Sequence, residues 1–211
     1  SADKSGMDRY QDLNDALDAW RKNPLARRII NLITAYVVGD GIQIRSEYKP
    51  LDDFIELFWF HGRNNLALRQ AEWSDELARA GELFLVLFTN PRDGSSHVRA
   101  VPAAMVDQIK WQDGDYETEL AFHEKGEPGD TDGTWWISAD HPDAADLERP
   151  VMCHYAVNRP VGAERGEGDL VAVLPWIRRY SRWLEDRIRL NAGVRKFLWI
   201  VYAPKRLVDE L

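Results

Sequence analysis

Residues 81–101, GELFLVLFTNPRDGSSHVRAV, decide the fold of this chain. An apolar run rich in leucine, valine and phenylalanine covers 82–90, and the turn sequence PRDG follows it at 91–94. A second short run, SHVRAV, occupies 96–101. An apolar run, a turn that contains proline and glycine, and a second run of strand length together predict an antiparallel β-hairpin.

Helical patterns precede this hairpin. Apolar residues recur at helical spacing over 8–37, and Asn23-Pro24 interrupts them, so we expect two consecutive helices there. Amphipathic patterns at 50–61 and 66–80 predict two more helices, the second ended by the glycine that follows it. Between these pairs, the glycines of VVGDGIQI stop a helix, and we expect a short strand at 42–45.

Strand-like segments follow the hairpin. We expect strands at 107–111, 116–122 and 151–156, and a short one at 134–138 within a loop-like region rich in Gly, Asp and Pro. The order is therefore helices, then antiparallel strands and hairpins, then a final helix. Long βαβ crossovers are absent from this order, so the predicted class is α+β rather than a doubly wound sheet.

The glycine-rich loop NRPVGAERGEGD at 158–169 raises the question of phosphate binding. A Walker loop needs lysine and then serine or threonine after its last glycine, but Asp169 and Leu170 occupy those positions. A dinucleotide-binding loop needs a third glycine where Val171 stands. Both phosphate roles are therefore disfavoured. We expect Asp169 to be the N-cap of a helix instead, with Gly168 giving the backbone freedom to turn into it.

The final helix has the most informative pattern. Its apolar spacing starts at Leu170, and a helix that continued to Ala203 would have about 34 residues and a length of about 50 Å, although 197–202 could instead begin a strand. We therefore divide the chain into an α+β domain at 1–168 and a helical region at 169–211. Such a length favours a helix that packs against copies of itself or lines the path of a polyanion, although a core helix with a charged outer side stays open. The arginines expected to face a DNA channel or a subunit interface are Arg178, Arg179, Arg182 and Arg189.

Charge is unevenly distributed along the chain. The 211 residues have a net charge of −8, but 113–148 hold twelve acidic residues and one lysine, while 151–211 hold eleven basic and seven acidic residues. This asymmetry indicates surfaces that face different partners or, more simply, solvated faces of opposite sign. The single cysteine, Cys153, excludes an intramolecular disulfide and a multi-cysteine zinc site. No uncharged apolar stretch reaches the roughly 18 residues that a membrane span needs, so no membrane contact is expected.

Acidic residues and histidines supply the remaining chemical candidates. Four acids alternate along a predicted turn and strand, so one face of that hairpin could hold a divalent metal for hydrolysis: Asp113, Asp115, Glu117 and Glu119. A solvated strand face is the commoner outcome of such alternation. The five histidines form no HxxxH or HExxH pair, and the neighbours Cys153 and His154 point to opposite faces of a strand. We therefore expect no catalytic residue, no metal and no cofactor.

Three stretches of the chain resemble tailed-bacteriophage portal proteins. The stretch AWRKNPLARRIINLITAYVVGDGIQIRS (19–46) is similar to the portal N-terminal segment, where an N-P-x-A-R helix runs into a V-V-G-x-G turn. The stretch LARAGELFLVLFTNPRDGSSHVRAVPAAMVDQI (77–109) is similar to the portal G-E-x-F strand, hairpin and P-x-x-x-V bridge. The stretch HYAVNRPVGAERGEGDLVAVLPWIRRYSRWLEDRIRLN (154–191) resembles the loop N-R-x-x-G-x-x-R-G-x-x-D-L and its following helix. The motif residues of this loop are Asn158, Arg159, Gly162, Arg165, Gly166, Gly168 and Asp169.

The resemblance implies a structural role and no enzymatic activity. Portal proteins of the virion form a homo-oligomeric ring, usually of twelve subunits, at one capsid vertex, and DNA passes through the channel without sequence-specific contacts. Terminase and head-completion proteins dock on the ring. By this resemblance, residues 8–168 are expected to form the portal wing and residues 169 to about 200 the first stem helix. The chain is then expected to be a fragment that ends near the start of the portal clip.

Two other hypotheses stay open at this point. One is a metal-dependent hydrolase that uses the acidic hairpin. The other is a DNA-binding or adaptor domain that uses the arginine-rich helix. For a portal we expect weak DNA affinity, because a passing duplex must not stick and the overall charge of the chain is negative.

Overall fold

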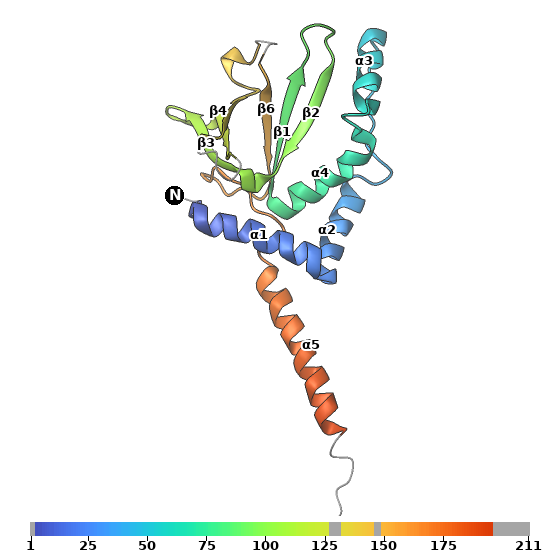
Figure 1. Ribbon diagram of the computed structural model, residues 1–211, viewed down its shortest axis with the longest axis vertical. Helices are drawn as coiled ribbons and strands as arrows, with labels where there is room; N and C mark the ends of the chain where they lie inside the picture. Colours follow the sequence, from blue (N-terminus) through green and yellow to red (C-terminus); the bar gives the residue numbers. More distant parts are fainter. Residues whose placement is uncertain (1–2, 127–131, 146–148, 196–211) are drawn as a thin grey trace, which may run out of the picture. The chain divides into compact units, whose positions relative to one another are not determined.

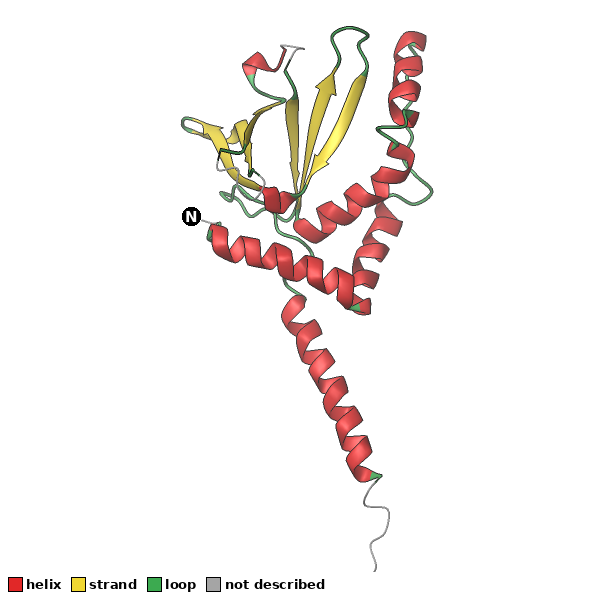
Figure 2. Cartoon of the chain, in the orientation of Figure 1, coloured by secondary structure: helices red, strands yellow, loops and turns green. Residues whose placement is uncertain are grey.

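The computed structural model describes residues 3–126, 132–145 and 149–195 (Figures 1 and 2). The helices are α1 (Gly6–Lys22), α2 (Pro24–Val37), α3 (Lys49–Phe60), α4 (Leu66–Ala80) and α5 (Leu174–Val194). The strands are β1 (Glu82–Thr89), β2 (Ser96–Val101), β3 (Val106–Gln112), β4 (Asp115–Glu124), β5 (Thr134–Ser138) and β6 (Val151–Ala156). Two short 3-10 helices are η1 (Ala103–Met105) and η2 (Pro142–Ala145). This mixture of helices and a largely antiparallel sheet confirms the predicted α+β class.

The six strands form one sheet in the order β2-β1-β6-β5-β4-β3. The predicted hairpin is confirmed as β1 and β2, which pair antiparallel from Phe84 opposite Val101 to Thr89 opposite Ser96. Its turn needs a positive φ, and Gly94 supplies it at 68°. Local turn chemistry therefore sets the register of the hairpin that the rest of the sheet extends.

One pair of strands differs from the expectation of an antiparallel sheet. β5 and β6 run parallel, with Ile137 opposite Val151 and Ser138 opposite Met152. A parallel pair needs a crossover of about a dozen residues, and the region 139–150 provides it. The sequence predicts a loop here, whereas Pro142–Ala145 form the 3-10 helix η2. Its residues 146–148 lie outside the described part of the chain.

The helix boundaries follow local capping chemistry. The side chain of Asn23 accepts hydrogen bonds from Leu25 N at 2.9 Å and Ala26 N at 3.3 Å, which ends α1 and starts α2 at the predicted Asn23-Pro24 break. Gly81 ends α4 in the left-handed conformation, with φ of 80°, and its N–H donates to Leu77 O. Gly81 therefore turns the chain from α4 into β1 within one residue.

The short strand predicted at 42–45 is wrong, because this segment has no regular structure. Its apolar residues Ile42 and Ile44 are exposed, and no neighbouring strand accepts its backbone groups. Ile42 N instead donates to the side-chain Oε1 of Gln70, at 2.8 Å. A few alternating residues are not enough to form a strand when no strand of the sheet pairs with them.

The chain divides into two compact units, Ser1–Leu174 and Pro175–Leu211. In the first unit, α1 and α4 lie at one end of the strands and the β1–β2 turn at the other (Figure 1). Its core joins α1, the end of α4 and the sheet. The core residues are Leu13, Ala80, Phe84, Val86, Val101, Ala103, Val106, Phe122 and Met152.

The start predicted for the final helix is wrong. Residues 169–173 form turns, and α5 begins at Leu174 and extends over 21 residues. Pro175 stands in its first turn, where its missing N–H costs nothing. At about 1.5 Å per residue the helix is about 31 Å long, and the predicted extension over 196–203 lies outside the described residues. Among the residues that the structure describes, no helix combines the length and apolar character of a membrane span.

Candidate functional site

The loop between β6 and α5 docks on Glu82, the first residue of β1. Glu82 is fully buried. Arg165 donates from Nε to Oε1 at 2.8 Å and from Nη2 to Oε2 at 2.9 Å, and Gly166 N donates to Oε1 at 3.0 Å. Arg9 of α1 donates to Oε2 from the other side. This Glu82 cluster therefore joins α1, the sheet and the loop through one carboxylate.

His154 of β6 lies next to the Glu82 cluster. Its Nδ1 lies 2.7 Å from Oε1 of Glu119, and its Nε2 lies 3.5 Å from Oε1 of Glu82. Its ring stacks on Phe84 with centroids 4.3 Å apart and an interplanar angle of 1°. Burial alone would lower the pKa of His154, but the hydrogen bond with Glu119 and the charges of both carboxylates raise it. The contact with Glu82, at 3.5 Å, lies outside hydrogen-bond geometry, so Glu119 is the stronger partner.

Glu82 stays ionised although it is buried. Burial alone would raise the pKa of its carboxyl group, but His154, Arg165 and Arg9 lower the pKa to about 2. For Arg9, burial and the nearby charge of Arg165 lower the pKa, and Glu82 raises it. The first two effects are larger, so the pKa of Arg9 is about 10. A buried carboxylate with this many cationic partners is typical of a structural ion cluster, and it is poorly suited to proton transfer near neutral pH.

A second group of contacts closes the end of the loop. Asn158 has a left-handed backbone, with φ of 53°. Its Nδ2 donates to Glu167 O at 3.0 Å and to Oδ1 of Asp169 at 2.9 Å. The backbone N–H of Asp169 donates to Ala78 O in the last turn of α4, at 2.8 Å. The prediction of Asp169 as a helix N-cap is therefore wrong, because its side chain binds Asn158 five residues before α5 begins.

Two glycines of the loop lie against backbone atoms. A Cβ on Gly166 would come within 2.1 Å of Gly81 O, and a Cβ on Gly168 within 2.0 Å of Arg79 O. No side chain fits at either position. These glycines therefore let the loop approach the α4–β1 junction closely, and this explains the glycine-rich composition without any phosphate.

The structure brings most of the predicted loop residues together. Arg165 and Gly166 join the Glu82 cluster, and Asn158, Gly168 and Asp169 fasten the loop to the end of α4. The other two members of the motif, Arg159 and Gly162, are exposed.

Sequence reasoning did not predict that Asp3 and Glu82 would bind this loop, or that Arg9 and His154 would contact Glu82. A usable signal existed for Glu82, because an acidic residue opens an otherwise apolar strand. Burial of such a residue requires a partner of opposite charge. No local pattern indicated that the partners would come from α1 and from the loop.

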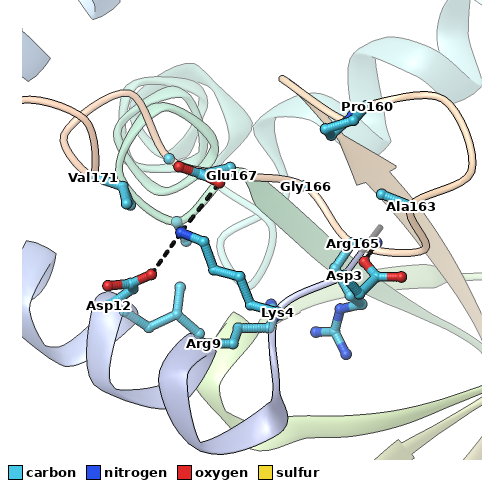
Figure 3. Close-up of a pocket in the computed structure, with 13 residues that line it drawn as sticks. Asp3, Lys4, Arg9, Asp12, Pro160, Ala163, Arg165, Gly166, Glu167 and Val171 are labelled. Atoms are coloured by element: carbon cyan, nitrogen blue, oxygen red, sulfur yellow. Dashed lines mark hydrogen bonds and ion pairs between the residues drawn. The ribbon is translucent and has the colours of Figure 1, made fainter. Parts of the chain in front are cut away.

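A small cavity lies between the start of α1 and the loop (Figure 3). Its volume is about 90 Å³. Lys4 lies between two acids there, with Nζ 2.7 Å from Asp12 and 3.2 Å from Glu167 (Figure 3). Asp3 lies next to Arg165 on the other side of the cavity (Figure 3). The residues ahead of α1 therefore contact the loop at two places.

In α5, the four predicted arginines do not share one face. At about 100° per residue, Arg178, Arg182 and Arg189 fall within about 40° of one another, while Arg179 lies at least about 60° away. The guanidinium of Arg179 lies over the ring of Trp176, 5.2 Å from its centroid. We call Arg178, Arg182 and Arg189 the arginine face of α5.

An exposed apolar surface lies on α3. No residue of this helix is buried. Leu51, Phe54, Leu57 and Phe60 are 45–66% exposed, and we call them the α3 patch. A neighbouring groove of about 470 Å³ is also largely apolar, with Trp59 and Trp73 in its wall. Several large apolar side chains exposed on one helix are typical of a protein interface.

The acidic hairpin does not gather into a metal site. Asp115 accepts hydrogen bonds from Thr118 Oγ1 and Glu117 N, and Glu119 binds His154. Across the described ranges, the structure holds no group of three or more His, Cys, Asp or Glu side chains placed to bind one metal ion. The carboxylates of this strand thus have separate local roles.

Comparison with known proteins gives limited likeness. No family model matches the chain, and no curated protein matches it. One similar solved chain belongs to a structure described as "Neck of empty GTA particle computed with C6 symmetry". The two chains are 15% identical, with a TM-score of 0.49, and the match covers 90% of this chain and 48% of the other. The chain spans about half the length of that neck chain, and a likeness at this level carries no argument about function.

Proposed function

We propose that this chain is a structural subunit of a phage-type portal ring, and that it has no enzymatic activity. The observation that carries the proposal is that two portal-like motifs meet in space. Glu82 belongs to the G-E-x-F strand and Arg165 to the N-R-x-x-G-x-x-R-G loop, and two hydrogen bonds join them. In the assembled virion, such a ring would contact capsid protein, terminase and head-completion proteins, and DNA would pass through it.

The α3 patch supports an oligomer. In a monomer these four side chains would leave a large apolar area in water, and burial stabilises by about 25 cal/mol per Å² of apolar surface. A second copy of the chain is the simplest partner for it, because a ring repeats one contact between identical subunits. We therefore assign the α3 patch to the contact between neighbouring subunits.

The experiment is a measurement of mass against concentration by light scattering and sedimentation velocity. The chain and a Leu68→Glu control should both gain mass with concentration, whereas Leu57→Glu should stay at 24.3 kDa. Leu57 and Leu68 are matched, since they are 66% and 69% exposed and only Leu57 belongs to the α3 patch. A constant mass of 24.3 kDa for the unaltered chain, or equal assembly of both variants, would contradict the proposal.

A further inference from the structure

We infer that the loop between β6 and α5 contains a binding site for a carboxylate, and that the chain fills this site with its own Asp3. The backbone N–H of Glu164 donates to both oxygens of the Asp3 carboxylate, at 3.0 and 2.9 Å. The next N–H, that of Arg165, donates to Oδ1 at 3.2 Å. Successive backbone N–H groups that converge on one anion form a nest, which is an established type of anion site.

The surroundings favour a carboxylate over a phosphate. Arg9 and Arg165 both bind Glu82, and Lys4 is shared between Asp12 and Glu167. The cations around the cavity are thus already neutralised by acids of the chain. A singly charged, planar carboxylate also presents two oxygens to the two N–H groups, as Asp3 does.

Because of the carboxylate site, the conformation of the loop depends on the residues before α1. Four successive backbone N–H groups of the loop find acceptors: those of Glu164 and Arg165 in Asp3, that of Gly166 in Glu82, and that of Glu167 in Val157 O. The first two depend on Asp3. Lys4 adds a contact with Glu167 (Figure 3). Loss of Asp3 therefore exposes two donors in the middle of the loop, while the Glu82 cluster keeps its own contacts.

The test is amide hydrogen exchange on the full chain carrying Asp3→Ala. The amides of Glu164 and Arg165 should exchange at least about tenfold faster than in the unaltered chain, because they lose their acceptor. Excess sodium acetate should restore slow exchange, and sodium chloride at equal ionic strength should not. Asp18→Ala is the matched control, since Asp18 is an α1 carboxylate whose side chain is 58% exposed and paired with Lys22.

Unchanged exchange in Asp3→Ala would overturn the inference. Fast exchange that acetate fails to slow would also overturn it, and so would rescue by inorganic phosphate that exceeds rescue by acetate. Faster exchange along β1 as well would mean that Asp3→Ala disturbs more than the loop. The comparison is then made with Asp3→Asn, which removes the charge and keeps the size of the side chain. The inference does not depend on ring assembly, so its outcome is independent of the portal proposal.

Discussion

Arg165 donates two hydrogen bonds to Glu82, 83 residues earlier in the chain, with Nε 2.8 Å from Oε1 and Nη2 2.9 Å from Oε2. The same guanidinium group donates to Val106 O at 3.1 Å, so one side chain ties the loop to two places in the sheet. Two-point pairing of arginine with a carboxylate fixes orientation as well as distance. The loop therefore has a defined position on the first structural unit.

Glu82→Gln should destabilise the chain by about 3–5 kcal/mol, because it leaves Arg9 and Arg165 without their buried counter-charge. Urea unfolding followed by tryptophan fluorescence measures the change. The control is Glu72→Gln, at an acid whose side chain is 73% exposed, and it should shift stability by less than about 0.5 kcal/mol. Equal effects of the two changes would show that the buried carboxylate has no special role.

Stability should fall steeply in acid through the same residue. The pKa of Glu82 is about 2 in the folded chain and 4.5 in its ordinary state, so its contribution is present above pH 4.5 and is lost as the pH falls toward 2. The free energy of unfolding, measured over this range, should have a smaller slope in Glu82→Gln than in the unaltered chain. Identical slopes would remove Glu82 as the source of the acid sensitivity.

Stability should also fall as the pH rises above 6.5, because of His154. Its folded pKa is raised above the ordinary 6.5, so its contribution is present below pH 6.5 and is lost as the pH rises through the folded pKa. Unfolding titrations on both sides of pH 6.5 should therefore show a decline that His154→Gln lacks. A decline of the same size in His154→Gln would assign it to another group.

Gly166→Ala should destabilise the fold by about 3 kcal/mol or more, because its Cβ would lie 2.1 Å from Gly81 O and 2.8 Å from Val157 O. Neither neighbour is the flexible end of a side chain. Thermal unfolding measures the effect. Gly62→Ala is the matched control, since nothing lies within 4 Å of the Cβ it would add. A melting temperature for Gly166→Ala equal to that of the control would show that the loop can move away from Gly81.

DNA binding should be weak and strongly dependent on salt if α5 lines a DNA path. Fluorescence anisotropy with a labelled duplex measures the slope of log K against log salt, which is negative. This slope should become less negative by about 2 in an Arg182→Ala, Arg189→Ala double variant. Arg179→Ala should change the slope less, because Arg179 lies off the arginine face and over Trp176. Nanomolar affinity at physiological salt would contradict a channel and favour the DNA-binding adaptor.

Local chemistry made much of the fold predictable from the sequence. Asn23 and Gly81 set helix ends through hydrogen bonds that span only a few residues, and Gly94 does the same for the hairpin turn. The α+β class followed from the order of these elements. The start of α5 was predicted wrongly because it depends on a more distant contact. The side chain of Asp169 accepts from Asn158, eleven residues earlier, and does not cap the helix.

The candidate site was only half predictable. The loop residues were recognised from their motif, but the residues they bind were not. Asp3 lies 161 residues before Glu164, and Arg9 lies 73 residues before Glu82. Hydrophobic periodicity reports on which face of an element is buried and carries no information about such distant pairs.

The junction of α3 and α4 covers the outer edge of the sheet at β2. Asn64, fully buried, accepts from Val98 N at 3.0 Å and donates to Ser96 O at 3.0 Å, and Arg69 donates to Val98 O at 3.1 Å. These side chains occupy the backbone groups that a further strand would need. Growth by addition of a strand from another copy, the route to fibrils, is therefore blocked at this edge of the sheet.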